Sequence, residues 1–245
     1  MKKKIIIVVF SLLLAFSIYK ISSYYIKINS NNKANEKLVK DVVKIEKVII
    51  DEEEVEIVTI DYDTLLGINK DVKAWIRFNH EKINYPVVQT NNNDYYLNHD
   101  FYKKSTFLGA IFMDYRNDYP NDKNTILYGH NITDGSMFGS LREALKSGFF
   151  DDSDNRIIEI IDIKNNVYHY EIFSIYTIVK EEYYLTTGFE NDDAYLEFLN
   201  TLKSRSNIDF GISLDETDNI LTLSTCDGVG ATNNRLVIHA KLIKK

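Results

Sequence analysis

A succession of short apolar stretches, each closed by turn residues, runs from about residue 61 to the end of this 245-residue chain. Stretches of this length that are rich in Val, Ile, Tyr and Phe are typical of β-strands. They read INYPVVQ, GAIFMDY, NTILYGH, RIIEIIDI, VYHYEIFSIYTIV, NILTLSTC and RLVIHAKLI. Few of them are separated by helical patterns, so the chain is predicted to be mainly β, with a mostly antiparallel sheet closed into a barrel or a sandwich.

Three local patterns refine this prediction. The segment IIDIKNNVYHY indicates a hairpin that turns at Lys164, Asn165 and Asn166. SMFGSLREAL has apolar residues four apart, and NDDAYLEFLNTL has them at i, i+3, i+4 and i+7 after Asn191, a residue type that caps helices. Both are therefore predicted helices, and the second, near residues 191–203, is amphipathic.

The amino terminus carries lysines followed by IIIVVFSLLLAFSIY, residues 5–19. This run is shorter than the about 20 residues that cross a bilayer, so it fits either a cleaved signal peptide or an anchor. Lys20 can snorkel, which extends the segment to Ile26, and no small-x-small cleavage site follows. We predict a single-pass type II anchor in the cell membrane, with the chain after about Lys27 outside the cell.

Three parts follow from these patterns: a cytoplasmic and membrane-anchoring segment at 1–27, a stalk with an N-terminal helix at 28–60, and a catalytic domain at 61–245. In the stalk, Leu38, Val42, Val43 and Ile45 fall at helical spacing. The acidic run at 51–54 is interpreted as a solvated face, because nothing there sets the ligand spacing of a calcium site. No metal and no cofactor are expected.

Composition limits the classes of function. At 44% hydrophobic residues the chain is globular rather than disordered. The formal net charge is −7, and the first 27 residues contribute lysines and no acid, so the exterior part is more acidic than the whole. Such a domain is a poor candidate for binding nucleic acid or anionic lipid.

The single cysteine, Cys226, stands where an apolar strand pattern gives way to the loop DGVGATNN. If the strands before and after this loop pair antiparallel, Arg235 becomes a neighbour of Cys226. A thiol is only a few per cent ionised at neutral pH, so a nucleophilic cysteine needs a base or a cation nearby. Arginine can stabilise the oxyanion that forms when sulfur attacks a carbonyl, and a histidine can protonate the leaving amine.

Of five histidines, His130 is the candidate, because it ends NTILYGH and enters a polar, glycine-containing loop. His80 and His99 lie in highly polar sequence, whereas His169 and His239 lie inside strand patterns and are interpreted as structural or surface residues. Taken singly, the cysteine fits a buried apolar filler and the arginine a surface charge. Periodicity and composition alone do not bring the three residues together.

The motif TLSTC, followed nine positions later by Arg235 and preceded by YGHN about a hundred residues upstream, resembles the signature of sortases, the cysteine transpeptidases of Gram-positive surfaces. Further segments resemble the class B branch over roughly residues 60–245: INKDVKAWI, INYPVVQ, DYYLNHDF, GAIFMDYRN and ILYGHNITDGSMFGSL. The resemblance implies an eight-stranded sortase-type β-barrel with peripheral helices.

It also implies roles for the candidates: Cys226 as nucleophile, His130 as general acid and base, and Arg235 as the group that stabilises the oxyanion or the substrate carbonyl. The enzyme would cleave a carboxyl-terminal sorting motif after threonine in secreted proteins. An amine of a peptidoglycan precursor or cross-bridge would then take the acyl group, which anchors the surface protein to the cell wall.

For the substrate groove, Ser224 and Leu97 match groove positions of the family, and Asn93, Tyr184 and Leu185 are candidates by local similarity. Their simpler interpretation is a loop amide and apolar residues of the barrel wall. Asp227 is expected to be an exposed loop carboxylate outside the catalytic set.

Two alternatives stay open from the residues alone. A membrane-anchored cysteine peptidase would form the same thioacyl intermediate and let water resolve it, although papain-like enzymes place the cysteine before the histidine. A non-enzymatic scaffold with a buried thiol would leave Cys226 unreactive towards thiol probes.

Overall fold

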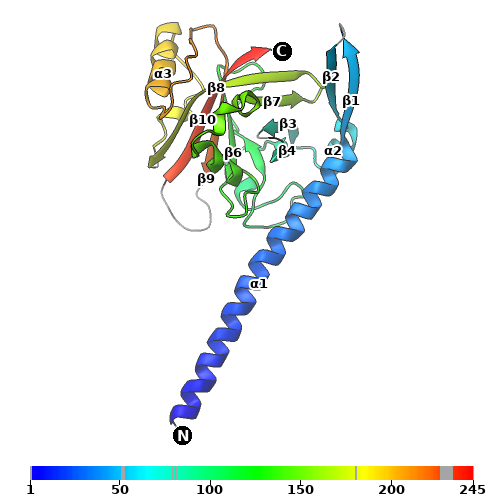
Figure 1. Ribbon diagram of the computed structural model, residues 1–245, viewed down its shortest axis with the longest axis vertical. Coiled ribbons are helices and arrows are strands. Elements are labelled where there is room, and N and C mark those ends of the chain that lie inside the picture. Colours follow the sequence, from blue (N-terminus) through cyan, green and yellow to red (C-terminus); the bar gives the residue numbers. More distant parts are fainter. Residues whose placement is uncertain are drawn as a thin grey trace. The chain divides into compact units, whose positions relative to one another are not determined.

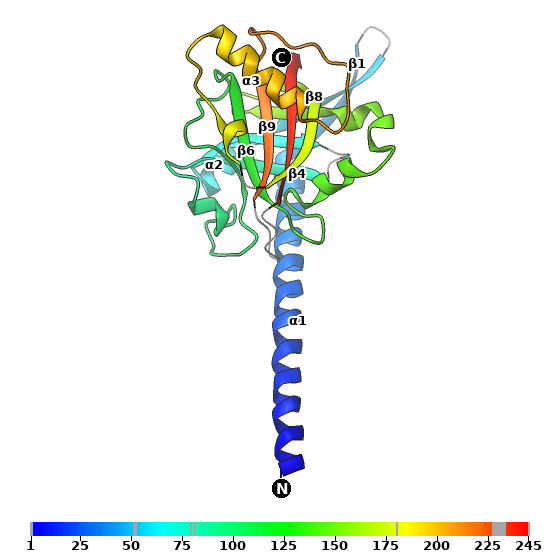
Figure 2. The same ribbon diagram turned by 90° about the vertical axis from the view of Figure 1, so that its left-hand side faces the viewer.

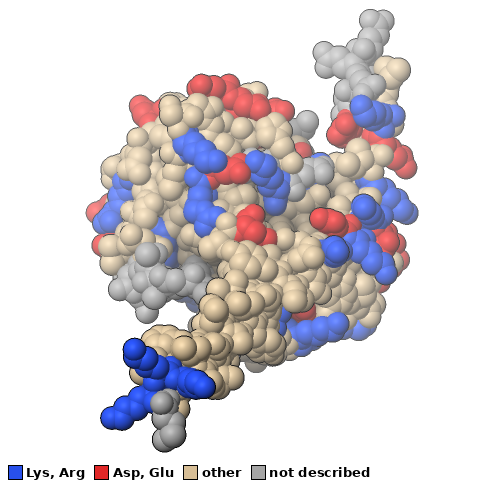
Figure 3. Space-filling view, turned by 60° about the horizontal axis from the view of Figure 1, so that its bottom comes forward, with Lys and Arg blue, Asp and Glu red and all other residues tan. Residues whose placement is uncertain are grey.

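The computed structural model describes residues 2–50, 53–78, 80, 82–179, 181–226 and 234–244. The chain divides into two compact units, Met1–Asp41 and Val42–Lys245. Apart from its last residue, helix α1 (Lys2–Val42) forms the first unit; it contains no Gly or Pro and is long and apolar enough to cross a membrane. Basic side chains gather at its amino-terminal end and an uncharged stretch follows (Figure 3).

The predicted helical stalk is wrong beyond Val42. Val43 and Ile45 belong to β1 (Val43–Ile50), which pairs antiparallel with β2 (Glu53–Ile60) in a separate two-stranded sheet. Both strands are rich in β-branched residues, and in part of each strand (VKIE and EVEI) these alternate with charged ones, which favours a strand over a helix. On this sheet Lys47 lies opposite Glu56, and their side chains form an exposed ion pair at 3.6 Å.

The second unit is built on a closed barrel with the strand order β10-β8-β7-β3-β4-β5-β6-β9 (Figure 1). The eight-stranded barrel predicted from the resemblance is confirmed. Among neighbouring strands, β4 runs parallel to β5 and β6 runs parallel to β9. All other neighbouring strands of the barrel are antiparallel. The strands are β3 (Val72–Phe78), β4 (Ile83–Val88), β5 (Ile111–Met113), β6 (Asn124–His130), β7 (Ile157–Asp162), β8 (Val167–Val179), β9 (Ile220–Cys226) and β10 (Asn234–Lys244).

Helical segments connect and cover these strands. The α-helices of this unit are α2 (Tyr62–Ile68) and α3 (Asp192–Ser204), and the 3₁₀ helices are η1 (Tyr95–Leu97), η2 (Gly139–Leu145), η3 (Phe149–Asp151), η4 (Ser153–Arg156) and η5 (Tyr183–Leu185). The predicted hairpin is confirmed, with Asn165 at φ 63° between β7 and β8. The helix predicted at SMFGSLREAL is instead the 3₁₀ helix η2, and Met137 just before it has φ 53°, which is incompatible with a helical start.

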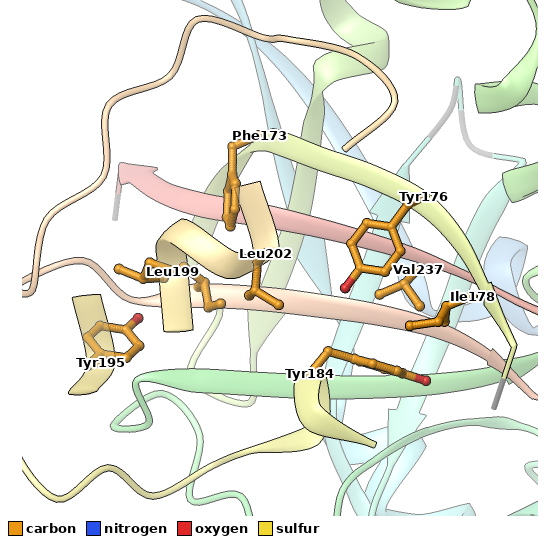
Figure 4. Close-up of a cluster of buried hydrophobic side chains, with 9 residues drawn as sticks. Phe173, Tyr176, Ile178, Tyr184, Tyr195, Leu199, Leu202 and Val237 are labelled. Carbon is orange, nitrogen blue, oxygen red and sulfur yellow. The ribbon is translucent and has the colours of Figure 1, made fainter. Parts of the chain in front are cut away.

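The amphipathic helix α3 is confirmed, and the Asn191 side chain caps it by accepting a hydrogen bond from the Ala194 amide at 2.8 Å. Its apolar face packs on the barrel in a cluster that also contains η5 (Figure 4). Members of the cluster include Phe173, Tyr176, Tyr184, Tyr195, Leu199, Leu202 and Val237. Each such side chain, once buried, contributes roughly 1.5–3 kcal/mol, so the cluster holds η5 against β8 and β10.

His239 lies fully buried inside this barrel wall and is therefore structural. Thr222 donates its hydroxyl hydrogen to the Asn124 side-chain oxygen at 2.7 Å, so it must accept from His239 Nδ1 at 2.9 Å. His239 Nε2 then accepts from the Tyr176 hydroxyl at 2.9 Å, and Tyr176 accepts from Tyr183 at 2.8 Å. This directional chain requires a neutral imidazole.

We expect stability to fall on acidification because of His239. Burial lowers the pKa of His239 from its ordinary value of 6.5 to about 3. Between these values the unfolded chain binds a proton that the folded chain does not, so the free energy of unfolding decreases as the pH falls, by up to about 1.4 kcal/mol per pH unit. Urea denaturation followed by fluorescence of the buried Trp75 measures this. His239→Gln should show a flatter dependence between pH 4 and 6, and equal slopes would contradict the assignment.

Candidate active site

Strand β9 lies between β6 and β10 in the barrel (Figure 2). Its last residue, Cys226, is the Cα partner of His130, the last residue of the parallel strand β6. On its other side β9 pairs antiparallel with β10, with Val237 opposite Ser224. The same register, continued by two residues, brings Arg235 to the level of Cys226. Cys226 thus lies level with the sequence-distant His130 on one side and with Arg235 on the other, at one end of the barrel. Residues 227–233, with Asp227, lie outside the described part.

The hydroxyl residues of the TLSTC motif are buried and hydrogen-bonded. Thr222 takes part in the His239 chain, and Thr225 Oγ1 accepts from the Leu236 backbone amide at 2.9 Å. The Ser224 hydroxyl lies 3.0 Å from the Tyr184 hydroxyl. Because each hydroxyl has a partner, the end of β9 is held in register with β10 up to the residue before Cys226.

The ring of His130 is oriented by a backbone carbonyl. Its Nε2 lies 2.7 Å from the Leu97 oxygen, and since a carbonyl only accepts, Nε2 carries the hydrogen. In the neutral ring the lone pair therefore lies on Nδ1, which is buried and makes no hydrogen bond with the part of the chain described. The free Nδ1 can take a proton or, once charged, return it.

Gly109 makes room for this ring. A Cβ at this position would lie 2.9 Å from His130 Cδ2 and 2.6 Å from the Tyr96 backbone oxygen, and its φ of 62° is left-handed. Only glycine adopts this conformation without strain and permits the close approach. Gly109 thus allows the loop before β5 to approach the histidine ring closely.

Arg235 is half-buried at the start of β10 and donates a long hydrogen bond of 3.5 Å to the Tyr184 hydroxyl. Tyr184 in turn contacts Ser224, so η5 contacts both β9, which ends at Cys226, and β10, which carries Arg235. An arginine is charged at any physiological pH and carries five donors in a fixed plane. This end of the barrel therefore combines a permanent cation with a histidine that can transfer protons.

The predicted groove residues fall into two groups. Leu97, Asn93 and Leu185 are half-buried, whereas Tyr184 and Ser224 are fully buried and hydrogen-bonded to each other. Leu97 also has a role that the sequence did not indicate, because its carbonyl orients His130.

Asp114 and Arg116 were missed by the sequence reasoning. Both follow β5, and their side chains form an ion pair at 2.8 Å in which the carboxylate is completely buried. Burial by itself would raise the pKa of Asp114, but hydrogen bonds from Arg116 and Tyr128 hold that pKa below its ordinary value. An acid and an arginine two positions apart after an apolar strand, in IFMDYR, are the available signal.

Within the described ranges, no three His, Cys, Asp or Glu side chains lie close enough to bind a metal ion.

A closed, mixed eight-stranded barrel in which a histidine and a cysteine end adjacent parallel strands is the architecture of a sortase-type cysteine transpeptidase. Residues 76–243 match the sortase domain family. Sortase B of Staphylococcus aureus (strain NCTC 8325 / PS 47) is 41% identical over 185 residues, 75% of each chain, and sortase B of Listeria monocytogenes is 37% identical over 183 residues, 74% of this chain and 73% of the relative.

Solved structures agree. Sortase B from Bacillus anthracis in complex with AAEK1 superposes with a TM-score of 0.77 at 35% identity, over 90% of this chain and 100% of that chain. A Staphylococcus aureus sortase B–substrate complex superposes with a TM-score of 0.69 at 40% identity, over 75% of this chain and 84% of that chain. The chain belongs to the sortase family and, within it, to sortase B. It is a cysteine transpeptidase that anchors surface proteins.

Proposed function

We propose that this enzyme cleaves a carboxyl-terminal sorting motif after threonine and transfers the acyl group to a peptidoglycan amine, with Cys226, His130 and Arg235 as its catalytic residues. The observation that carries the proposal is the strand register, in which β9 ends at Cys226 between His130 on β6 and the start of β10. This register supports the proposal because it sets the backbone of Cys226 level with that of His130, and its continuation sets it level with that of Arg235.

In the first half of the reaction the Cys226 thiolate attacks the carbonyl carbon of the threonine. The developing oxyanion is stabilised by the Arg235 guanidinium. Protonated His130 gives its proton to the departing amine, the C–N bond breaks, and a thioester joins the substrate to Cys226.

In the second half an amine attacks the thioester, neutral His130 takes the proton from the attacking nitrogen, and the C–S bond breaks. The hydrogen bond from His130 Nε2 to the Leu97 carbonyl supports Nδ1 as the nitrogen that carries the proton in both halves. A solved sortase B, 40% identical to this chain, is complexed with triglycine, which makes a glycine amine the acceptor to test first.

Peptide recognition is assigned to Leu97, Asn93, Tyr184, Leu185 and Ser224. Leu97, Asn93 and Leu185 are half-buried and are assigned to direct contact with an extended peptide, while the buried Tyr184 contacts both Ser224 and Arg235. The long apolar helix α1 supports a type II membrane anchor, with residues 1–27 as the anchor, 28–60 as the stalk and 61–245 as the extracellular catalytic domain.

The test uses the full-length protein in detergent, a quenched-fluorescence peptide library with one fixed threonine, and triglycine. Mass spectrometry should find the amino-terminal fragment, ending in threonine, joined to triglycine. A fragment with a free carboxylate even at high triglycine would favour the peptidase alternative. Rapid labelling of Cys226 by methyl methanethiosulfonate with loss of turnover is also expected, and an unreactive thiol would favour a scaffold.

Arg235→Lys separates geometry from charge. Lysine keeps the positive charge but loses the planar fork, so the single-turnover acylation rate should fall by about 10²-fold or more, the scale of one oxyanion-hole donor. The pH dependence of Cys226 alkylation should change little. Near-normal acylation in this variant would show that Arg235 acts only as a nearby charge.

A further inference from the structure

Asp114 is a carboxylate with no exposed side-chain surface, located just after β5. Its Oδ1 accepts from the Arg116 backbone amide at 3.0 Å and from Arg116 Nε at 2.8 Å. Its Oδ2 accepts from Arg116 Nη2 and the Tyr128 hydroxyl, both at 2.8 Å, and from Asn93 Nδ2 at 3.0 Å. A buried charge needs such partners, so Asp114 holds three neighbouring side chains in place.

Asn93 is held at both ends of its amide group. Its Nδ2 donates to Asp114, and its Oδ1 accepts from the Tyr115 backbone amide at 3.0 Å. The residue is nevertheless partly exposed. Its contacts with the loop after β5 therefore fix the position of a side chain that solvent can reach.

Arg116 reaches from this loop to a segment almost seventy residues later. Its Nη2, which already contacts Asp114, also donates to the Leu185 carbonyl at 2.9 Å. The amide of Asn124 supports the same segment by donating to the Tyr184 and Thr186 carbonyls at 3.2 and 2.9 Å. One guanidinium therefore connects the loop that holds Asn93 with the η5 turn that carries Leu185.

We propose that Arg116, through Asp114, is a positioning residue that determines the spacing of Asn93 and Leu185 across the peptide groove and hence the affinity for the sorting peptide. The inference rests on the proposed function, in which these two residues contact the peptide. Arg116 itself does not touch the reacting atoms.

The chemistry explains why arginine stands here. Asp114 could be neutralised by lysine, but a single ammonium cannot pair with both carboxylate oxygens and reach Leu185 in the geometry of the fork. Arg116→Lys therefore keeps the charge and removes the bridge. Asp114→Asn removes the buried negative charge while preserving the shape of the side chain, and so tests the contribution of Asp114 to the ion pair with Arg116.

The experiment uses the full chain in detergent, the best peptide from the threonine library, and triglycine. Arg116→Lys and Asp114→Asn should each raise the KM for the peptide about fivefold to tenfold, the scale of one or two lost hydrogen bonds, with kcat changed less than about twofold. The KM for triglycine should stay unchanged. Arg156→Ala removes a similar donation to a backbone carbonyl, from Nε to Phe150 at 3.0 Å, and should leave the peptide KM unchanged.

A double-mutant cycle with Asn93→Ala connects the bridge to the groove. If Arg116 acts by positioning Asn93, Asn93→Ala should cost less peptide affinity in the Arg116→Lys background than in the wild type. Strictly additive effects of the two substitutions, an unchanged peptide KM, or a loss confined to kcat would overturn the inference. In each of these cases, turnover by the wild-type chain would still uphold the proposed function. A wild-type chain that joins no library peptide to triglycine would overturn both.

Discussion

Replacing Cys226 by alanine is expected to abolish both cleavage of the threonine peptides and their transfer to triglycine. The substitution removes the only sulfur nucleophile of the chain, and without a thioester the two half-reactions have no common intermediate. The rate should fall to the uncatalysed background, measured by release of the quenched fluorophore over hours.

The fold should survive this change, because Cys226 is the last residue of β9 and its pairing with β6 is made by the backbone, which alanine preserves. Unchanged Trp75 fluorescence and an unchanged urea midpoint would establish this. Turnover by a folded Cys226→Ala protein above background would exclude covalent catalysis by this residue.

Replacing His130 by alanine is expected to lower the acylation rate by about 10²- to 10⁴-fold, the usual contribution of general acid–base catalysis. The loss should persist at alkaline pH, where the thiol ionises without help, because the departing amine still needs a proton. The measurement is the single-turnover rate between pH 6 and 10.

His169→Gln provides the matched control. His169 also lies on a barrel strand, where its Nε2 is 3.4 Å from Glu159, and its replacement should leave the rate unchanged. Full recovery of His130→Ala at high pH would contradict the role proposed here, and would mean that His130 only ionises Cys226.

The strands of this fold are predictable because their signal is local. Stretches such as NTILYGH and NILTLSTC are rich in apolar and β-branched residues, and in the structure residues 124–129 of β6 and 220–225 of β9 are buried on both faces. The hairpin at Asn165 and the cap at Asn191 follow equally from a few neighbouring residues. The helical spacing at residues 43–50 was misleading, because β-branched residues fit a two-residue period just as well.

The site is only partly predictable, because only some of its contacts are local in the sequence. The proximity of Cys226 and Arg235 follows from a hairpin, which is a local event. The partnership of Cys226 with His130 depends on the parallel pairing of β6 and β9, strands that are distant in sequence, and no local pattern encodes it. The partnership of Cys226 with His130 was predicted only from the resemblance to sortases. The bridge from Arg116 to Leu185 is likewise a long-range contact and had no sequence signature strong enough to be recognised.

The proposed reaction depends on a thioester on Cys226, and intact-protein mass spectrometry can detect this intermediate. Full-length enzyme mixed with the library peptide, without an amine acceptor, should gain the mass of the peptide fragment that ends in threonine. Peptide mapping should place it on Cys226, and triglycine should remove it at the rate at which the joined product appears. Product formation without any adduct, or an adduct that persists in Cys226→Ala, would rule out a thioester on Cys226.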